Sequence, residues 1–274
     1  MNKSPIGVFD SGYGGLTVLK EITAKLPQYD YIYLGDNGRA PYGNRSFETI
    51  YQYTWQCVQW FFAQGCPLVV LACNTASAKA LRSIQQKDLP MYASDKKVLG
   101  VIRPTTEVIG NYSKNKKVGI LATNGTVESQ SYPIEIHKFF PDVKVYQLAC
   151  PIWVPLVENN EYKNDGADYF IEKNIKQIMM QDAGIDTILL ACTHYPLLID
   201  KIKKYLPAGV TVIAQGEIAA ASLAAYLQRH TEIEMQLSKG SEKKFYTTDS
   251  TEDFDAHAAV FYGSAVQSIH VDIS

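Results

Sequence analysis

The sequence lacks the features that mark nucleic-acid-binding, membrane and secreted proteins. Its 26 Lys and Arg residues stand against 28 Asp and Glu residues, and no run of basic residues forms a stripe that could follow a phosphate backbone. No apolar stretch is long enough to span a bilayer, and MNKSPIGVFDSG reaches a glycine-rich turn without a signal-peptide core. We therefore expect a cytoplasmic protein that binds neither nucleic acid nor a membrane.

Cofactor and metal signatures are also missing. The five cysteines, at positions 57, 66, 73, 150 and 192, form neither a CxxC pair nor an even disulfide framework, so a reducing compartment would keep them as thiols. The stretch FDSGYGG has Thr17 where a dinucleotide fingerprint needs its third glycine, and there is no Walker sequence. The histidines lack metal-ligand spacing. We expect no cofactor and no metal.

Eight short apolar runs alternate with amphipathic helical patterns along the chain. The runs are PIGVFDSG, DYIYLGD, PLVVLACN, VLGVIRPT, KVGILATNG, VKVYQLAC, TILLACTH and VTVIAQGE. This alternation is typical of parallel sheets with crossover helices, an α/β fold. One helix is predicted within residues 46–65, capped by Ser46, ended by Gly65 and apolar on one face through Phe47, Ile50, Tyr51, Val58, Phe61 and Phe62.

The eight runs form two sets of four that match in order. The matched pairs are Gly7 with Gly119, Cys73 with Cys192, and Ile102 with Ile213, at separations of 112, 119 and 111 residues. We therefore predict two pseudo-symmetric lobes, each a mostly parallel sheet flanked by helices, with the active site in the cleft between them. The expected first lobe is 1–97 plus 209–274, and the expected second lobe is 98–208.

The twin stretches LVVLACNTASA and TILLACTHYPL each carry Ala-Cys at the exit of an apolar strand. Such a pair also suits a crowded strand–helix junction, because free cysteine is often buried. Two cysteines at equivalent places favour function, since ligands bind at the carboxyl ends of parallel strands and a helix N-terminus stabilises a thiolate. If the lobes face one another, Cys73 and Cys192 face the same cleft.

Two facing thiols fit a reaction at a stereocentre. A carbon acid whose proton leaves from one face and returns to the other needs a base and an acid on opposite sides, with roles that exchange in the reverse reaction. That reaction is racemisation. A single catalytic cysteine would instead suggest nucleophilic attack with a histidine base, for which Cys192 and His194 are the candidates.

Other polar residues at strand exits are candidates for holding substrate or supporting the thiols. Asp10 and Ser11 end the first strand beside glycines that let backbone N–H groups approach an anion. Thr123 and Thr126 hold the corresponding place in the second lobe, either as ligand donors or as helix caps. The remaining candidates are Asp36, Tyr42, Gly43 and, just beyond an apolar loop, Glu158.

At these residues the chain resembles glutamate racemase, of the aspartate/glutamate racemase superfamily. FDSGYGG, GDNGRAPYG, ACNTASA, VPLVE and ACTHYPLL come in the order and approximate spacing of that family, and YTTDSTEDFDAHAAVFYG is similar to its closing segment. The resemblance implies cofactor-independent racemisation of glutamate between two lobes, commonly in a homodimer. It also implies a supply of D-glutamate for bacterial peptidoglycan, and hence a role in cell-wall biogenesis and cell shape.

The resemblance assigns roles to the residues that match. It implies that Cys73 takes the proton from D-glutamate and Cys192 takes it from L-glutamate, with support from Asp10 and His194 and, secondarily, from Asp36 and Glu158. The expected substrate contacts, to which the strand-exit argument adds the two threonines of the second lobe, are Asp10, Ser11, Pro41, Tyr42, Gly43, Asn74, Thr75, Thr123, Thr126, Thr193 and His194.

The chain departs from the family in two places, and rival functions remain open. Members often have Asp-Ser where this chain has Ala214-Gln215, and Arg103 stands at a variable position. The rivals are a related aspartate or hydantoin racemase, a thiol hydrolase for which Cys73 is dispensable, and an amino-acid binding protein without turnover.

Overall fold

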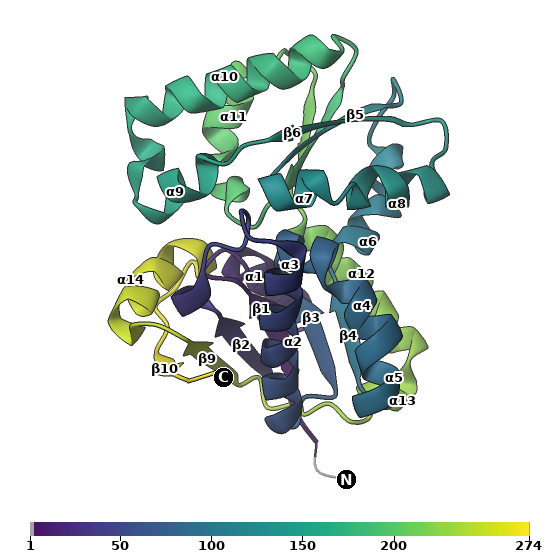
Figure 1. The fold of residues 1–274 in the computed structure, drawn as a ribbon, viewed down its shortest axis with the longest axis vertical. Helices are drawn as coiled ribbons and strands as arrows, with labels where there is room; N and C mark the ends of the chain where they lie inside the picture. The colour runs from purple at the N-terminus through teal and green to yellow at the C-terminus, as the bar shows by residue number, and fades with distance from the viewer. Residues whose placement is uncertain (1–2, 274) are drawn as a thin grey trace.

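The computed structural model describes residues 3–273 and arranges ten strands in two sheets, in which every strand pairing is parallel (Figure 1). The six-stranded sheet has the order β10-β9-β2-β1-β3-β4, and the four-stranded sheet has the order β6-β5-β7-β8. The strands are β1 Ile6–Asp10, β2 Tyr31–Gly35, β3 Leu68–Leu71, β4 Lys97–Gly100, β5 Lys117–Ala122, β6 Lys144–Ala149, β7 Thr187–Ala191, β8 Thr211–Ile213, β9 Lys243–Thr247 and β10 Ser268–His270.

Helices cover both faces of each sheet (Figure 1). The first lobe has α1 Leu16–Lys25, α2 Phe47–Ala63, α3 Asn74–Lys79, α4 Leu81–Ser83, α5 Leu89–Tyr92, α12 Gly216–Arg229, α13 Thr231–Glu234 and α14 Thr251–Tyr262. The second lobe has α6 Ile102–Thr106, α7 Asn124–Glu128, α8 Ser131–Phe139, α9 Trp153–Glu158, α10 Asp165–Gln181 and α11 Ile199–Tyr205. Short 3₁₀ or π turns lie at Asn37–Arg39, Ile84–Asp88, Ile109–Asn111, Glu161–Lys163 and Tyr195–Leu198.

The central strands are buried on both faces, as continuous apolar runs predict for a parallel sheet. Every residue of β1, β2, β3 and β7 is buried. One face of the first sheet packs on α2 around Phe61, and the other packs on α1 and α12 around Leu19 and Leu223. This double cover fixes the strands rigidly, so that the loops at their carboxyl ends are held in place.

The two lobes share a core of four strands in the same order, which confirms the predicted pseudo-symmetric fold. The strand order β2-β1-β3-β4 of the first sheet corresponds to β6-β5-β7-β8 of the second. The matching register pairs are Gly7 with Val69 in the first sheet and Gly119 with Ile188 in the second, each four residues before the cysteine that follows its strand. The twin cysteines therefore occupy equivalent positions.

The third expected pair, Ile102 with Ile213, is wrong. Gly100 ends β4 opposite Leu71, whereas Ile102 already begins α6. Ile213 lies within β8, opposite Leu189. Ile102 and Ile213 therefore do not hold equivalent positions. Counting residues along the chain misplaced them because the helical segments before β4 and β8 differ in length.

The lobe boundaries also need correction. A boundary at residue 98 cuts β4, which belongs to the first sheet, and a boundary at residue 209 assigns β8 to the wrong lobe. We place the boundaries after β4 and after β8. The chain thus crosses between the lobes twice, once into α6 and once into α12, and these two helices contact each other.

The predicted first-lobe helix is confirmed, with one residue wrongly placed. The Ser46 side chain accepts a hydrogen bond from the Thr49 amide at 3.2 Å, and Gly65 has a φ of +88°, as a helix stop requires. Phe47, expected on the buried face, is 52% exposed because it stands in the first turn, beyond the edge of the sheet. Two strands, β9 and β10, extend the first sheet beyond the eight that the apolar runs predict.

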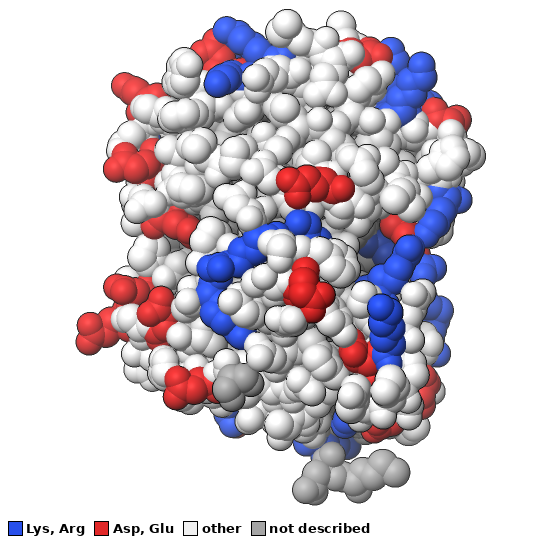
Figure 2. All heavy atoms as spheres, viewed as in Figure 1, with Lys and Arg blue, Asp and Glu red and all other residues white. Residues whose placement is uncertain are grey.

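Among residues 3–273, no helix combines the length and the apolar character needed to cross a bilayer. On the face shown in Figure 2, acidic and basic side chains are intermixed over both lobes.

Candidate active site

The carboxyl ends of four central strands lie around a cavity between the lobes. Ser11 follows β1, Cys73 lies two residues after β3, Thr123 follows β5 and Cys192 follows β7, and all four line the cavity. Its volume is about 90 Å³, which is small beside the 300–1,000 Å³ or so typical of pockets for drug-sized ligands. The two cysteines come from different sheets, so that a small molecule in the cavity has one thiol from each lobe.

Most of the residues expected to bind substrate meet at this cavity. Besides the two cysteines, the lining includes Ser11, Pro41, Tyr42, Gly43, Asn74, Thr75, Thr123, Glu158, Thr193 and His194. They come from loops that the sequence separates by up to about 180 residues and that the parallel sheets bring to one edge.

Cys73 is held at the start of α3. Its sulfur accepts a hydrogen bond from the Ala76 amide at 3.4 Å and lies 3.4 Å from the Ser11 hydroxyl. Burial raises the pKa of the Cys73 thiol to about 12, and the charge of Asp10 adds to the increase, while the hydrogen bonds from Ser11 and Ala76 act against it. Burial therefore favours the protonated thiol at Cys73, which is the form that can donate a proton.

Asp10 lies directly behind this half of the site and is 1% exposed. Its carboxylate accepts hydrogen bonds from the Gly12 amide at 3.1 Å and from the Thr193 hydroxyl at 3.5 Å. Burial raises the pKa of Asp10 to about 6, although nearby His194 and the backbone amides of Gly15 and Gly12 act to lower it. Asp10 thus ties the first-lobe loop to the loop that carries Cys192.

Cys192 has a different neighbour. His194, two residues further on, is buried, and its Nε2 lies 3.0 Å from Glu158 Oε1 on α9. Burial by itself lowers the pKa of His194, but hydrogen bonds with Cys192 and Glu158 outweigh it and raise the pKa to about 10. An imidazolium beside Cys192 stabilises a thiolate there.

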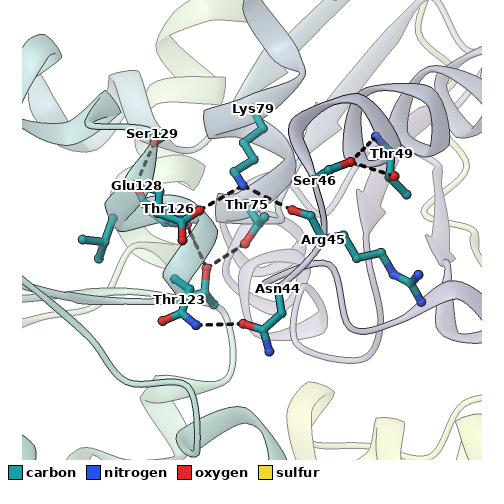
Figure 3. Close-up of polar contacts among 12 residues, drawn as sticks. Asn44, Arg45, Ser46, Thr49, Thr75, Lys79, Thr123, Thr126, Glu128 and Ser129 are labelled. Carbon is teal, nitrogen blue, oxygen red and sulfur yellow. Dashed lines mark hydrogen bonds and ion pairs between the residues drawn. The ribbon is translucent and has the colours of Figure 1, made fainter.

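Polar contacts between the lobes close one side of the cavity (Figure 3). The hydroxyl groups of Thr75 and Thr123 lie 2.9 Å apart, and the Gly125 amide donates to the Gly43 carbonyl at 2.9 Å. Asn124 donates to the Asn44 side chain at 3.0 Å. These contacts join the first-lobe loop 40–46 and α3 to α7 of the second lobe.

Lys79 is the charged member of this closure (Figure 3). Its side chain is 8% exposed, and its Nζ lies 3.3 Å from the Arg45 carbonyl oxygen and 3.5 Å from Glu128 Oε2. Because Arg45 belongs to the first lobe and Glu128 to the second, the ammonium group joins the two lobes. We call this set of contacts between loop 40–46, α3 and α7 the closed seam.

Asp36 requires a correction. It does not line the cavity: its carboxylate accepts hydrogen bonds from Arg39 Nε at 2.8 and 3.0 Å, from the Thr248 hydroxyl at 2.8 Å and from the Tyr42 hydroxyl. These partners hold the loop that presents Pro41 to Gly43. Asp36 therefore supports the cavity wall and has no free oxygen directed at a substrate.

Asp10 and Thr126 also stand behind the lining rather than in it. Thr123 caps α7 by accepting from the Thr126 amide at 3.4 Å, and its hydroxyl lies 3.2 Å from that of Thr126. Thr123 is thus both a cap and a lining residue, whereas Thr126 only orients it.

The sequence argument missed one wall of the cavity. Cys150, Pro151, Val154 and Pro155, from the exit of β6 and from α9, line it together with Gly12, Ala40, Asn44 and Asn124. Cys150 stands at the β6 exit as Asp36 stands at the β2 exit, because Ala122 pairs with Ala149 as Asp10 pairs with Gly35. That equivalence in the repeat was the available signal.

Within residues 3–273, no group of three or more His, Cys, Asp or Glu side chains is placed to hold a metal ion. The polar groups of the cavity are thiols, hydroxyls, amides, one imidazole and one carboxylate, and none of its described lining residues is a lysine or arginine.

Two similar parallel sheets, with a thiol from each at one cavity, define a two-lobed α/β protein whose cavity lies between the lobes. The chain belongs to the Asp/Glu/Hydantoin racemase family, whose model matches residues 7–223. It is an isomerase of the amino-acid racemase class.

Individual relatives make the likeness more specific. The chain is 39% identical to the glutamate racemase of Shouchella clausii over 98% of this chain and 95% of the relative. A glutamate racemase isoform from Bacillus anthracis superposes with a TM-score of 0.90 at 34% identity, covering 100% of this chain and 99% of that one. The Francisella tularensis glutamate racemase, solved in complex with D-glutamate, gives a TM-score of 0.88 at 30% identity, covering 100% and 99%.

Proposed function

We propose that this protein racemises glutamate without a cofactor, with Cys73 and Cys192 as the two acid–base groups. The observation that carries the proposal is that the two thiols, equivalent in the repeat, line one small cavity from two different sheets. Relatives named glutamate racemase match over almost the full length of the chain, which favours glutamate over the alternative substrates.

In the direction from L- to D-glutamate, the Cys192 thiolate takes the Cα proton and the Cys73 thiol delivers a proton to the opposite face. In the reverse direction, the Cys73 thiolate takes the proton and the Cys192 thiol delivers one. No bond to another atom of the substrate breaks, so that one proton leaves and one returns in each turnover.

The two thiols have different charged neighbours. The raised pKa of His194 favours an imidazolium beside Cys192, whereas burial raises the pKa of the Cys73 thiol. That imidazolium can stabilise the Cys192 thiolate that takes the proton from L-glutamate.

The enclosed cavity makes it easier for a thiolate to remove the Cα proton, which is only weakly acidic. A thiolate in water has little driving force against such a carbon acid, so that water must be excluded and fixed donors must face the developing carbanion. The closed seam at Thr75, Thr123 and Gly43 excludes water on one side. Hydroxyl, amide and backbone N–H groups are the donors that remain for the carboxylates of the substrate.

Circular dichroism of substrate solutions tests the proposal directly. L-glutamate should lose its signal and D-glutamate should lose the opposite one, each decaying to zero. L-aspartate and hydantoins should decay far more slowly. Faster decay of the aspartate signal would identify aspartate, and not glutamate, as the substrate. If none of the signals decayed, the protein would be an amino-acid binding protein without turnover.

Hydrogen exchange tests the two-base route. In D₂O, each enantiomer should acquire deuterium at Cα as it converts, because the proton that returns comes from the other thiol. Product formed with its original proton would contradict the two-base scheme. A thiol hydrolase using Cys192 and His194 would turn over esters or amides even in Cys73→Ala.

We also infer that the protein is cytoplasmic, acts as a homodimer and supplies D-glutamate for peptidoglycan, and hence for cell-wall biogenesis and cell shape. The five cysteines are all buried and unpaired, as suits a reducing compartment. The sedimentation of the purified protein tests the dimer.

A further inference from the structure

Gln215 occupies the second crossing between the lobes. It is the second of the two residues between β8 of the second sheet, which ends at Ile213, and α12 of the first lobe, which begins at Gly216, and it is 4% exposed. A buried side-chain amide is costly unless its donors and acceptor are all paired, so its partners show what holds it there.

Three side chains close a hydrogen-bonded ring around this crossing. Asn74 Nδ2 donates to Gln215 Oε1 at 2.7 Å, Gln215 Nε2 donates to the Tyr132 hydroxyl at 2.7 Å, and that hydroxyl donates to Asn74 Oδ1 at 2.5 Å. The other N–H of Gln215 Nε2 has the Thr105 hydroxyl at 2.9 Å and the Val101 carbonyl at 3.3 Å. Each group in the ring gives one proton and accepts one.

A closed ring of this kind can run in two directions, and the Val101 carbonyl, which accepts a hydrogen bond from Gln215 Nε2, selects one of them. If the Asn74 amide turned over, its NH₂ would face the Tyr132 hydroxyl and its oxygen would face Gln215 Oε1, which has no proton to give. Burial raises the pKa of Tyr132 well above its usual range, and the nearby Cys192 adds to the increase, so that the phenol keeps the proton it donates. Gln215 therefore fixes the direction of the Asn74 side chain.

Asn74 connects the ring to the chemistry. It is the first residue of α3, directly after Cys73, and it lines the cavity. Tyr132 belongs to α8 of the second lobe, Thr105 to α6, and Asn74 to the first lobe. The ring thus joins both lobes at the point where the wall beside Cys73 is built.

We propose that Gln215 is a positioning residue that acts through Asn74: together with Tyr132 it holds the Asn74 amide in the orientation that binds glutamate and ties that orientation to the closed arrangement of the lobes. The inference rests on the proposed racemisation of glutamate. It gives a role in substrate binding to a residue that does not touch the cavity.

A double-mutant cycle tests it. Gln215→Met keeps the length of the side chain and removes its polar atoms. It should lower kcat/KM for both enantiomers about fivefold to tenfold, the effect of losing one net hydrogen bond, with most of the change in KM. In the Asn74→Ala background, the same substitution should change kcat/KM less than about twofold, because the residue it acts through is gone.

Tyr132→Phe covers the case in which Gln215→Met does not fold. It removes one oxygen from the ring and should raise KM, as Gln215→Met does, but by a smaller factor. This increase should also require that Asn74 is present. Tyr31→Phe is its matched control, because Tyr31 is 1% exposed and its hydroxyl donates to the Leu26 carbonyl at 2.7 Å, at the amino end of β2. That control should lower Tm without changing KM.

The outcomes separate the two proposals. Additive effects of Gln215→Met and Asn74→Ala, or a KM in Tyr132→Phe no higher than in Tyr31→Phe, would overturn the positioning role while racemisation stands. A wild-type protein that does not racemise glutamate at all would overturn the proposed function, and this inference with it.

Discussion

The two halves of the active site have equivalent backbone arrangements, but the charged residues beside their thiols differ. Cys73 and Cys192 follow strands of different sheets at equivalent register positions. Around Cys73 stand Ser11 and the carboxylate of Asp10, whereas Cys192 has the imidazolium of His194. Equivalent positions therefore have a carboxylate near one sulfur and an imidazolium near the other.

The difference shows what symmetry has to supply and what it does not. Two mirror-related proton transfers need two sulfurs on opposite sides of one carbon, and the repeated fold provides that geometry. In achiral water the equilibrium constant for racemisation is one, so that kcat/KM must be equal in both directions whatever the charges are. Unequal charges can change kcat and KM separately, with compensating shifts.

The largest effect expected is the loss of either thiol. Cys73→Ser and Cys192→Ser should each lower racemisation of glutamate by about a thousandfold or more, because each removes an acid–base group. Circular dichroism measures the rate. Cys66→Ala is the control: this thiol is also fully buried, but it lies in the first-lobe core and should leave kcat within about twofold. Normal activity in either serine variant would refute the two-base scheme.

Removing the positive charge of His194 should affect the Cys192 half of the site more than the Cys73 half. His194→Asn should lower kcat/KM about a hundredfold, with kcat falling more from L- to D-glutamate than in reverse, since Cys192 loses the group that stabilises its thiolate. Full progress curves from each enantiomer give the separate constants.

Asp10→Asn is the matched change on the other side. It takes away the anion beside Cys73 and should lower kcat more from D- to L-glutamate. If both variants lowered kcat by equal factors in the two directions, the halves would act as one unit and the contrast drawn above would fail.

Weakening the closed seam should have a moderate effect on both halves. Lys79→Met removes the ammonium group that joins Arg45 to Glu128. It should raise KM about threefold and remove most of the dependence of KM on salt, because Glu128 is largely exposed and such pairs are weak and screened. Lys176→Met, which breaks an exposed pair with Glu172 inside α10, should leave KM unchanged.

The smallest effect concerns stability against pH. The pKa of His194 is raised to about 10, so that its stabilising contribution is complete below its ordinary value near 6.5 and is lost as the pH rises through 10. Asp10, with a pKa raised to about 6, acts in the same sense between its ordinary value of 3.8 and 6. Tm should therefore fall between pH 7 and 10, by the equivalent of a few kcal/mol at most, and His194→Gln should flatten the slope. An equally steep fall of Tm with pH in His194→Gln would show that a group other than His194 causes the pH dependence.

The sequence was enough to locate most of the cavity because parallel sheets bring their strand exits to one edge. Ser11, Cys73, Thr123 and Cys192 were predictable for that reason. The register of β4 and β8 was not predictable, because it depends on hydrogen bonds rather than on chain counting.

The misplaced residues show what tertiary contacts add. Asp36 is an acidic residue at a strand exit, like Asp10, but Arg39 turns its carboxylate away from the cavity. The wall of Cys150, Val154 and Pro155 is apolar and depends on how α9 packs. β9 was missed because it begins with two exposed lysines and so lacks a continuous apolar run, although it lies between β10 and β2.

The double crossing of the chain between the lobes, into α6 and into α12, limits how they can separate. A body fastened at two points can swing only about the line through them, whereas one fastened at a single point can also twist. Two crossing points would thus restrict any separation of the lobes to a rotation about one line, which would return the two sulfurs to the same alignment.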